Sequence, residues 1–526
     1  MTKRPYPAVG IDLGTTYTVA ARLDDVNRPC TLINAEGDRL TPSVVLLDEG
    51  EIVIGKEAVK AMGTEMERVA EGAKRDVGQR MFHRALGGRR YPPETIEAWV
   101  LDKVRRDTRD QIGDSHKVVI TVPAYFDEVR RKATQDAGYI AGFEVLDIIN
   151  EPTAAAVAFG FQHGYLSAER RDQGPRRILV YDLGGGTFDV TLMQLGGRDF
   201  VALATDGDVQ LGGRDWDQRL VDCVAEEFIR EHGLDPREDQ NVEGQLLREC
   251  EDAKRTLSSR SAVNLSCQYR GKAISREVTR EEFEDMTLDL LDRTSFTTRQ
   301  TLKAAGFEWS DIDRILLVGG STRMPSVRRM LQDLSGIEPD RSVSPDEAVA
   351  HGAALHAGLL LDKHEGRVPQ FQVRNVNSHS LGVVATESQT KRVLNAVLIP
   401  RNTPLPAEKK KVFRTQKHGQ RSVLVRIVEG EATDPDHCSQ IGKCSIRDLP
   451  AGLAKNTPIE VGFRYLENGR LNVRVKVAGT GKLLRHEIVR DNSLTQEQLN
   501  GWRRYISGLP PLAQIVRHGE KSSVQS

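Results

Sequence analysis

Two separate stretches of the chain place an aspartate directly before a turn rich in glycine and threonine. They run over Val9–Thr18 and Val180–Val190, and in both the turn lies between two apolar, β-prone runs. This pattern predicts two β-hairpins, each with a carboxylate at its tip. The glycines let backbone N–H groups approach an anion, and the aspartate can hold a hydrated Mg²⁺ against it. Because the order of residue types matches, we favour two facing hairpins that grip a nucleoside triphosphate over two unrelated glycine-rich hairpins.

Length and composition limit the classes of protein to which the chain can belong. Its 526 residues allow roughly two to four domains with large cores. The net charge of −1 supplies no basic field for nucleic acid or an anionic membrane surface. The sequence contains no apolar run of the ~18 residues that a membrane span needs, and its charged N-terminus is unlike a signal peptide. We therefore expect a cytoplasmic protein that binds neither nucleic acid nor membrane.

The cysteines support the same compartment. Six are scattered along the chain, and the closest pair, Cys438 and Cys444, lacks the surrounding His and Cys residues of a zinc site. This usage predicts free thiols in a reducing environment.

Residues 1 to about 358 alternate strand signals with helix signals. The run Val118–Pro123 is typical of a buried strand that ends at proline, and residues 127–142 then favour a helix. Ile315–Gly320 repeats the change from strand to glycine and is again followed by a helical pattern. This alternation predicts an α/β domain with mainly parallel strands.

The pattern changes after residue 358. The apolar run Leu359–Asp362 precedes a polar, turn-prone segment, which predicts an interdomain linker. Alternation with period two then dominates, most clearly in a hairpin over 459–477 with its turn at 467–469. The predicted boundaries are a first domain over 1–358, a linker over 359–370, an all-β domain over 371–493, and a residual helix with a flexible tail over 494–526.

Several further segments resemble the Hsp70 (DnaK-type) chaperone family, which has the actin/hexokinase/Hsp70 nucleotide-binding fold. Besides the two hairpins, these segments are Val122–Phe126, Ile149–Ala156, Glu251–Ser258, Leu317–Pro325 and Pro345–Val349. The resemblance is strong over 1–362 and weaker over 378–490. It implies the fold class α/β, with a two-lobed ATPase domain followed by a β-sandwich that binds peptides.

The resemblance also implies the residues that handle the phosphates of ATP. In this family the corresponding hairpin residues contact the phosphates, here Gly14, Thr15, Thr16, Tyr17, Gly184, Gly185 and Gly186. Asp12 and Asp182 would hold Mg²⁺ through water, and the family also allows K⁺. The catalytic set would be Lys74, Asp12, Asp182, Thr187 and Asp189. Phosphoryl transfer to water depends on positioning and charge neutralisation, which these residue types supply without a covalent nucleophile.

A helix face is expected to form one wall of the nucleoside site. Glu251, Lys254, Arg255 and Ser258 are spaced i, i+3, i+4 and i+7, a pattern that usually indicates a solvated face with ion pairs. The resemblance instead favours contacts to the adenosine. It implies that further nucleotide-binding residues are Gly212, Gly213, Asp215, Gly319, Gly320, Ser321, Arg323 and Asp346.

The family's interdomain relay corresponds to Pro123, Arg131 and Glu151, with Leu360 and Leu361 of the predicted linker docking in one state. In the β domain, the resemblance assigns Val383, Phe413, Val423 and Val425 to a pocket for an extended apolar polypeptide. Each of these four is equally consistent with a plain core residue. A nucleotide exchange factor is a further partner that the family allows.

The sequence departs from the family in four places. The segment between Lys74 and Pro123 is shortened, and the helical lid is missing after Ser507, which predicts fast and weak peptide exchange. Asp147 stands where the family has a basic residue that docks an acidic J-domain motif, so we do not expect J-domain stimulation without a specialised partner. Extra residues at 387–392 alter a loop that faces substrate.

Other functions remain open from sequence. A small-molecule kinase or an actin-like filament subunit would share the fold but leave residues 371–490 unexplained. A regulatory scaffold that binds ATP with little turnover is a fourth reading, which the intact Asp12, Lys74 and Asp182 disfavour. No P-loop motif occurs, and the glycines join two strands, unlike the strand-to-helix turn of a Rossmann dehydrogenase.

Overall fold

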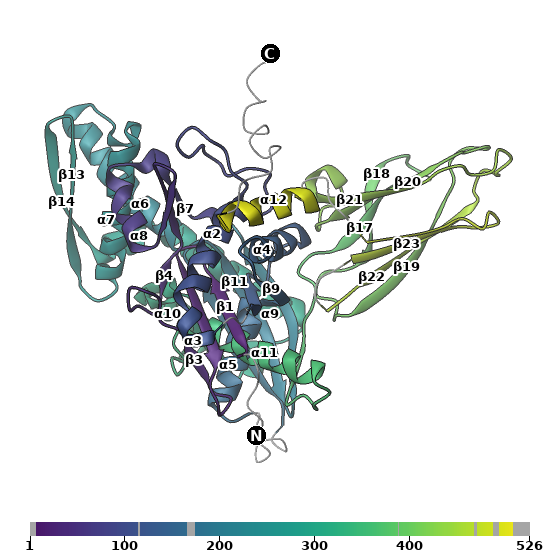
Figure 1. Cartoon of the computed structure of the whole chain (residues 1–526), viewed down its shortest axis with the longest axis horizontal. Coiled ribbons are helices and arrows are strands. Elements are labelled where there is room, and N and C mark those ends of the chain that lie inside the picture. Colours follow the sequence, from purple (N-terminus) through teal and green to yellow (C-terminus); the bar gives the residue numbers. More distant parts are fainter. Residues whose placement is uncertain are drawn as a thin grey trace.

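The computed structural model describes residues 7–113, 116–165, 174–387, 389–467, 471–487 and 494–508. A two-lobed α/β body carries an arm of β-strands that extends from its side (Figure 1). Within the described residues, no helix is both long and apolar enough to cross a bilayer.

The first lobe is built on a mixed sheet with the first hairpin near its centre. Strand β1 (Val9–Leu13) pairs antiparallel with β2 (Tyr17–Leu23) and parallel with β8 (Lys117–Val122). The outer strands are β9 (Glu144–Asn150), β3 (Pro29–Thr31) and β4 (Thr41–Pro42). The apolar runs around each turn therefore become buried strands, and the turn itself lies at the end of the sheet.

The second lobe repeats this plan with the second hairpin. Strand β10 (Arg176–Leu183) pairs antiparallel with β11 (Phe188–Gly196) and parallel with β15 (Arg314–Val318). Strands β12 (Asp199–Asp208) and β16 (Gln372–Arg374) extend the sheet beyond β11. The two sheets thus present their turns from equivalent positions.

Two helices rich in small residues pack between the sheets. They are α5 (Glu151–Gln162) and α11 (Ala348–His364), and their alanines share one core with residues of both sheets. A Cβ at Gly352 would collide with the backbone of Ala154, so the two helices approach more closely than larger side chains would allow. This packing fixes the position of one hairpin turn relative to the other.

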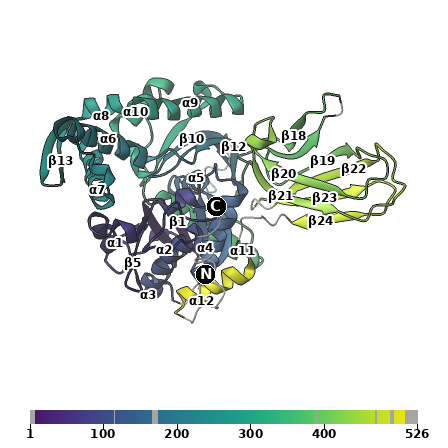
Figure 2. The ribbon, with the colours of Figure 1, turned by 90° about the horizontal axis from the view of Figure 1, so that it is seen from above.

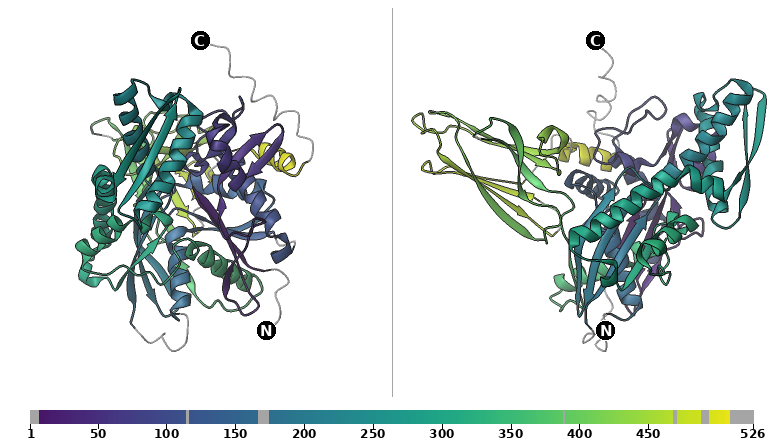
Figure 3. Two further views of the ribbon diagram at one scale, coloured as in Figure 1. Left: turned by 90° about the vertical axis from the view of Figure 1, so that its left-hand side faces the viewer. Right: turned by 180° about the vertical axis from the view of Figure 1, so that it is seen from behind.

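Peripheral elements surround both lobes. The first lobe adds α1 (Lys56–Lys60), α2 (Pro93–Asp107), α3 (Arg109–Ile112), α4 (Glu128–Ile140) and a small sheet of β5 (Val44–Asp48), β6 (Glu51–Ile54) and β7 (Val69–Glu71). The second lobe adds α6 (Gly213–His232), α7 (Gln240–Leu257), the hairpin β13 (Ala262–Tyr269) and β14 (Lys272–Thr279), α8 (Arg280–Met286), α9 (Leu288–Ala305) and α10 (Pro325–Ser335). The β13–β14 hairpin and the β-strand arm lie at opposite ends of the molecule (Figure 3, right).

The arm is a sandwich of two antiparallel four-stranded sheets. One has the order β18 (Val393–Ile399), β17 (Leu381–Thr386), β20 (Val423–Glu429) and β21 (Ser439–Ile446), and the other β19 (Ala407–Arg414), β22 (Pro458–Tyr465), β23 (Leu471–Val477) and β24 (Leu483–Glu487). Strands β22 and β23 form the hairpin predicted from period-two alternation, with Phe463 opposite Val473. Two residues of its predicted turn, Asn468 and Gly469, lie outside the described residues, as does Ser388 in the altered loop.

The structure corrects the start of the predicted linker. Helix α11 continues through Leu359 to His364, and Leu360 and Leu361 pack against the core between the sheets. Alanine and leucine favour the helix, and no glycine follows Leu359 until Gly366. The apolar run is therefore the end of a helix, and the chain leaves the body only after β16 has paired with the edge of β12.

The predicted C-terminal helix is present as α12 (Gln496–Ile506) and packs on the first lobe. It starts with a capping box between Thr495 and Gln498. Leu499 is buried, and Tyr139 of α4 donates a hydrogen bond of 2.6 Å to Asn500 Oδ1. Seen from above, α12 runs along the edge of the body, away from the sandwich (Figure 2). The segment that follows the sandwich thus returns to the first domain.

Candidate functional site

The two hairpin turns meet at a cavity of about 930 Å³ between the lobes. A Cβ at Gly185 would collide with Thr16, and one at Gly186 would collide with Thr15. Glycine is therefore required where the turns touch, because any larger residue would push them apart. Both turns line the cavity, through Gly14, Thr15, Thr16, Gly184, Gly185 and Thr187. This is the facing arrangement that the repeated pattern suggested.

Lys74 lies at the base of this cavity in a buried ion pair. A short 3-10 helix, η3 (Ala73–Asp76), carries it after Gly72, which adopts a left-handed conformation. Its Nζ donates to Glu151 Oε1 at 2.6 Å, where α5 begins. Burial alone would lower the pKa of Lys74, but the charges of Glu151 and Asp12 raise it above its ordinary value. Lys74 is therefore held as a cation.

Three aspartates lie near the same point, of which Asp182 and Asp189 are buried and Asp12 is half-buried. Thr121 donates to Asp12 Oδ1 at 3.1 Å, and the backbone N–H of Tyr125 donates to Asp189 Oδ1 at 2.8 Å. Burial raises the pKa of Asp12 to about 7 and that of Asp189 to about 8, and the charge of Glu151 adds to both shifts. Burial likewise raises the pKa of Asp182 well above its ordinary range. One lysine does not balance so much buried acid.

This excess of acid fits a divalent cation. Carboxylates are preferred ligands of Mg²⁺, and a cation would remove the mutual repulsion that raises these pKa values. Among the described residues, no three acidic, His or Cys side chains cluster closely enough to ligate a metal by themselves. The donor set therefore suits an ion that keeps part of its water shell and is completed by phosphate oxygens.

The predicted nucleoside wall lines the cavity, but its residues are largely engaged with one another. Lys254 is buried, and its Nζ donates to Gly213 O at 2.8 Å and to Asp217 Oδ2 at 2.7 Å. Arg255 donates to Tyr17 Oη at 2.8 Å and pairs with Glu251 at 2.5 Å. Lys254 thus stabilises this wall of the cavity through its own hydrogen bonds, whereas Arg255 and Tyr17 line the cavity.

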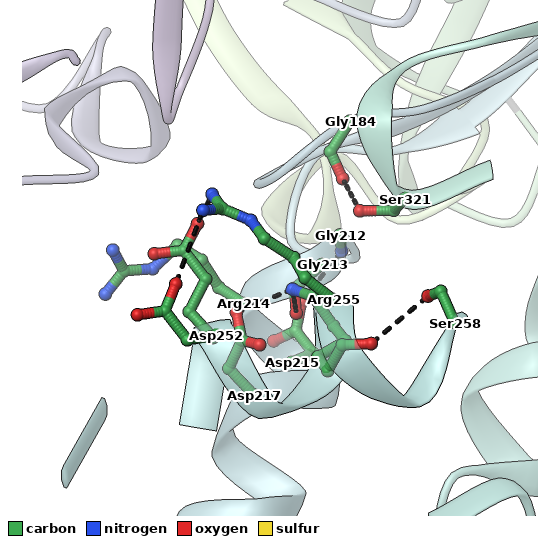
Figure 4. A network of polar contacts seen from close by, with 12 residues as sticks. Gly184, Gly212, Gly213, Arg214, Asp215, Asp217, Asp252, Arg255, Ser258 and Ser321 are labelled. Carbon is green, nitrogen blue, oxygen red and sulfur yellow. Dashed lines mark hydrogen bonds and ion pairs between the residues drawn. The ribbon is translucent and has the colours of Figure 1, made fainter. Parts of the chain in front are cut away.

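On the opposite side, Ser321 donates to Gly184 O at 2.9 Å (Figure 4). Arg323 pairs with Asp346 at 2.5 Å on the same side. Ser258 donates to Lys254 O within its own helix. The bond from Ser321 ties the glycine-rich segment after β15 to the second hairpin turn. The lining residues on this side also include Gly319 and Gly320.

Five of the residues predicted to bind or hydrolyse the nucleotide are not among those that line the cavity. They are Gly186, Asp189, Gly212, Gly213 and Asp215. Gly212 packs against Gly186, and its backbone N–H donates to Asp215 Oδ2 at 2.7 Å (Figure 4). Gly212 and Asp215 therefore support the second turn.

Sequence reasoning missed two arginines beside this support. Arg75 pairs with Asp215 and donates through Nε to Gly186 O at 2.9 Å. Arg214 pairs with Glu71 and lines the cavity. Their partners lie far away in sequence, so local spacing could not predict that these arginines belong to the site. The one indication was that Arg75 directly follows Lys74.

The predicted relay residues lie on a connected path. Arg131 donates to Asn150 Oδ1 and, through Nε, to Phe126 O at 3.3 Å. Asn150 directly precedes Glu151, the partner of Lys74. Pro123 follows the last residue of β8 and lies three residues before Phe126. The path therefore starts at the base of the cavity and ends at the surface that carries the sandwich.

The sandwich contacts the body through polar side chains. His379 Nε2 donates to Tyr125 O at 2.9 Å, and Arg401 pairs with Asp206 at 2.8 Å and donates to Thr205 O at 3.2 Å. Tyr125 thus bonds to the sandwich through its carbonyl and to Asp189 through its N–H. One residue links the base of the cavity to the β-strand arm.

The four residues predicted to line a peptide pocket belong to the core of the sandwich. Val383, Val423 and Val425 are buried, and Phe413 packs beside them in the core of the sandwich. Asp147, predicted to repel an acidic motif, accepts a hydrogen bond of 2.9 Å from His356 of α11.

The chain matches known proteins along nearly its whole length. The family model described as Hsp70 protein matches residues 8–86 and 81–505. The chaperone protein DnaK of Halobacterium salinarum is 40% identical over 499 residues, which cover 94% of this chain and 76% of that protein. DnaK of Thermus thermophilus is 39% identical over 525 residues, with 94% and 82% covered, and DnaK of Thermosipho africanus is 38% identical over 506 residues, with 95% and 82% covered. These matches confirm the predicted fold class, with α/β nucleotide-binding lobes followed by antiparallel β-sheets, and the chain belongs to the Hsp70 family of ATP-binding chaperones.

Proposed function

We propose that the chain binds ATP with Mg²⁺ in the interlobe cavity, hydrolyses it, and thereby regulates the affinity of its β-sandwich for extended apolar polypeptides. The observation that carries this proposal is the buried pair of Lys74 and Glu151 among three aspartates, directly beside two glycine-rich turns that touch. Facing N–H groups, a fixed cation and excess buried acid are together the requirements for a metal–triphosphate complex.

Each residue of the site would have a role that depends on its position. The backbone N–H groups at Gly14–Thr16 and Gly184–Thr187 would bind phosphate oxygens from both sides, and Asp12 and Asp182 would hold the waters of Mg²⁺. When bound, the metal neutralises charge on the phosphates. Lys74 would turn from Glu151 toward the terminal phosphate and align the attacking water. Thr187 would hydrogen-bond a terminal phosphate oxygen, and Asp189 would orient the water.

Coupling to the sandwich would use the Tyr125 segment. A shift of Asp189 or Glu151 on hydrolysis would move Tyr125 or Asn150, which contact His379 and Arg131 respectively. A nucleotide can change the sandwich only if it binds the two arrangements with different affinity. The arrangement in which Val383 and Val425 are buried would then be one of these two, and an opened pocket would accept the polypeptide as an added extended segment.

The proposal extends to the chain's surroundings. All six cysteines are free, in keeping with the cytoplasm as its compartment. A nucleotide exchange factor remains a proposed partner. Asp147 accepts a hydrogen bond from the buried His356, so a J-domain protein would have to recognise a surface that lacks the family's basic residue at this position.

The test is ATP hydrolysis measured with and without an unfolded apolar peptide. We expect the peptide to raise the rate several-fold in the wild type, and Lys74→Ala to lower hydrolysis by about 10²-fold, the scale for loss of one charge-stabilising group. Lys272→Ala, an exposed lysine on β14, is the matched control and should behave as wild type. Turnover that requires a sugar or polyol would instead indicate the kinase.

A further inference from the structure

Helix α2 places a carboxyl behind Lys74 that has no role in the mechanism above. Glu97 is 2% exposed, and its Oε2 is buried without a hydrogen-bond partner among the described residues. Buried carboxyl oxygens are nearly always paired, and an unpaired one in a native fold calls for an explanation. Glu97 lies next to the site because α2 packs against η3, the short helix that carries Lys74.

Lys74 is the charged group that acts on Glu97. Burial raises the pKa of Glu97 to about 8, and the charge of Lys74 partly opposes that shift. The elements packed on α2 are η3, α3, α4, α12, β5 and β6. Charges from α4, Asp136 and Lys132, act on Glu94 instead. Glu97 therefore carries a proton at neutral pH and responds to the catalytic lysine.

The same helix supplies a matched comparison one turn earlier. Glu94 is also buried, and burial raises its pKa to about 7. Lys74 is not among the charges that act on it. Two buried acids on one helix thus differ in whether they face the catalytic lysine.

Lys74 consequently lies between two acids with different tasks. Glu151 holds it at 2.6 Å in the structure, and the proposed reaction requires Lys74 to leave that partner for the terminal phosphate. A neutral Glu97 does not oppose this movement. An ionised Glu97, in a dry site where charges interact strongly, would attract the ammonium and hold it back.

We propose that Glu97 is a positioning residue for Lys74: uncharged, it leaves the lysine free to reach the phosphate, and ionised, it withholds the lysine. This inference rests on the proposed function, because it concerns a lysine that acts in ATP hydrolysis. It assigns Glu97 no contact with substrate.

The experiment is a pH profile of single-turnover hydrolysis of bound MgATP by the full chain, from about pH 6.5 to about pH 9.5. We expect the wild-type rate to fall with a midpoint near the pKa of about 8 and to be about tenfold lower one pH unit above that midpoint. Glu97→Gln should abolish the fall while leaving the neutral rate and ATP affinity within about twofold. Glu97→Met, which keeps the length and removes the polar atoms, should do the same.

The control is Glu94→Gln, which should keep the wild-type profile because Glu94 faces α4. Thermal melts of each variant show that it is folded. An alkaline fall that persists in both Glu97→Gln and Glu97→Met would overturn the inference while leaving the proposed ATPase intact. Absence of hydrolysis in the wild type at every pH would overturn the proposed function and the inference with it.

Discussion

At the scale of single residues, the site is dominated by acid that the protein cannot neutralise alone. Asp182 and Asp189 are buried and Asp12 is half-buried beside Lys74, and the pKa values of all three are raised. The types and spacing of these aspartates were predictable, because each stands next to a glycine-rich turn. Glu97 was not predictable, because an acid within an ordinary helical pattern carries no sign of the lysine that it faces.

The buried acid predicts how stability depends on pH without metal. Asp12 has a higher pKa in the folded chain, about 7, than its ordinary value of 3.8, so the folded chain binds more protons between these values. Stability therefore falls as pH rises through this range. Asp12→Asn should remove that loss and raise the metal-free stability at about pH 8 by on the order of 4 kcal/mol, since the shift is about three pKa units and each corresponds to about 1.4 kcal/mol.

Thermal melts in a chelator across this pH range measure the effect. Asp252→Asn, an exposed acid on α7, is the control and should follow the wild type. If Asp12→Asn melts lower than the wild type at alkaline pH, Asp12 is not an uncompensated buried charge.

At the scale of elements, the sequence predicted those helices and strands that depend on local patterns, and it did not predict those that depend on long-range pairing. Both hairpins followed from apolar runs around turns, and the β22–β23 hairpin from alternation. The apolar run at Leu359 was misassigned because apolar residues alone do not separate the last turn of a helix from a linker. Strand β16 has no pattern of its own, and it forms only because the edge of β12 is available for pairing.

Helix α12 gives the prediction at this scale. Its contact with the first lobe is centred on Leu499, and Arg503 lies 4.7 Å from the ring centre of Tyr139. Leu499→Ala should weaken docking by about 2–3 kcal/mol, the usual cost of truncating a buried leucine. Hydrogen exchange of α12 amides should accelerate correspondingly, whereas exposed Glu497→Ala should leave it slow. Rapid exchange already in the wild type would mean that α12 is not docked in solution.

At the scale of the whole molecule, two domains are held together by polar contacts and by β16. The cavity lies in one domain and the proposed peptide pocket in the other, so any communication must cross the contacts between them. These contacts include His379 with Tyr125, Arg401 with Asp206, and Val129 of α4 against the core of the sandwich. Sequence predicted both domains from the change in periodicity. It could not predict how they dock, because that depends on pairs such as Arg401 and Asp206 that no local pattern relates.

Arg401 tests this communication. Arg401→Ala removes a half-buried interdomain ion pair and should weaken docking by about 1–2 kcal/mol, less than the loss of a fully buried pair. Peptide stimulation of hydrolysis should then fall to within about twofold of the basal rate, with ATP affinity unchanged. Arg426→Ala, an exposed arginine on β20, is the control. Full stimulation in Arg401→Ala would show that this contact does not carry the coupling.

If the two touching turns hold a metal-bound triphosphate, ATP should bind far more tightly with Mg²⁺ than without it, and calorimetric titration measures both affinities. We predict that Mg²⁺ makes ATP binding much tighter. Gly185→Ala should weaken this binding by at least about tenfold, because the Cβ of the new alanine would collide with Thr16. Gly174→Ala, where an added Cβ meets no atom within 4 Å, should bind as wild type. Equal affinity with and without Mg²⁺, or unchanged affinity in Gly185→Ala, would contradict the claim.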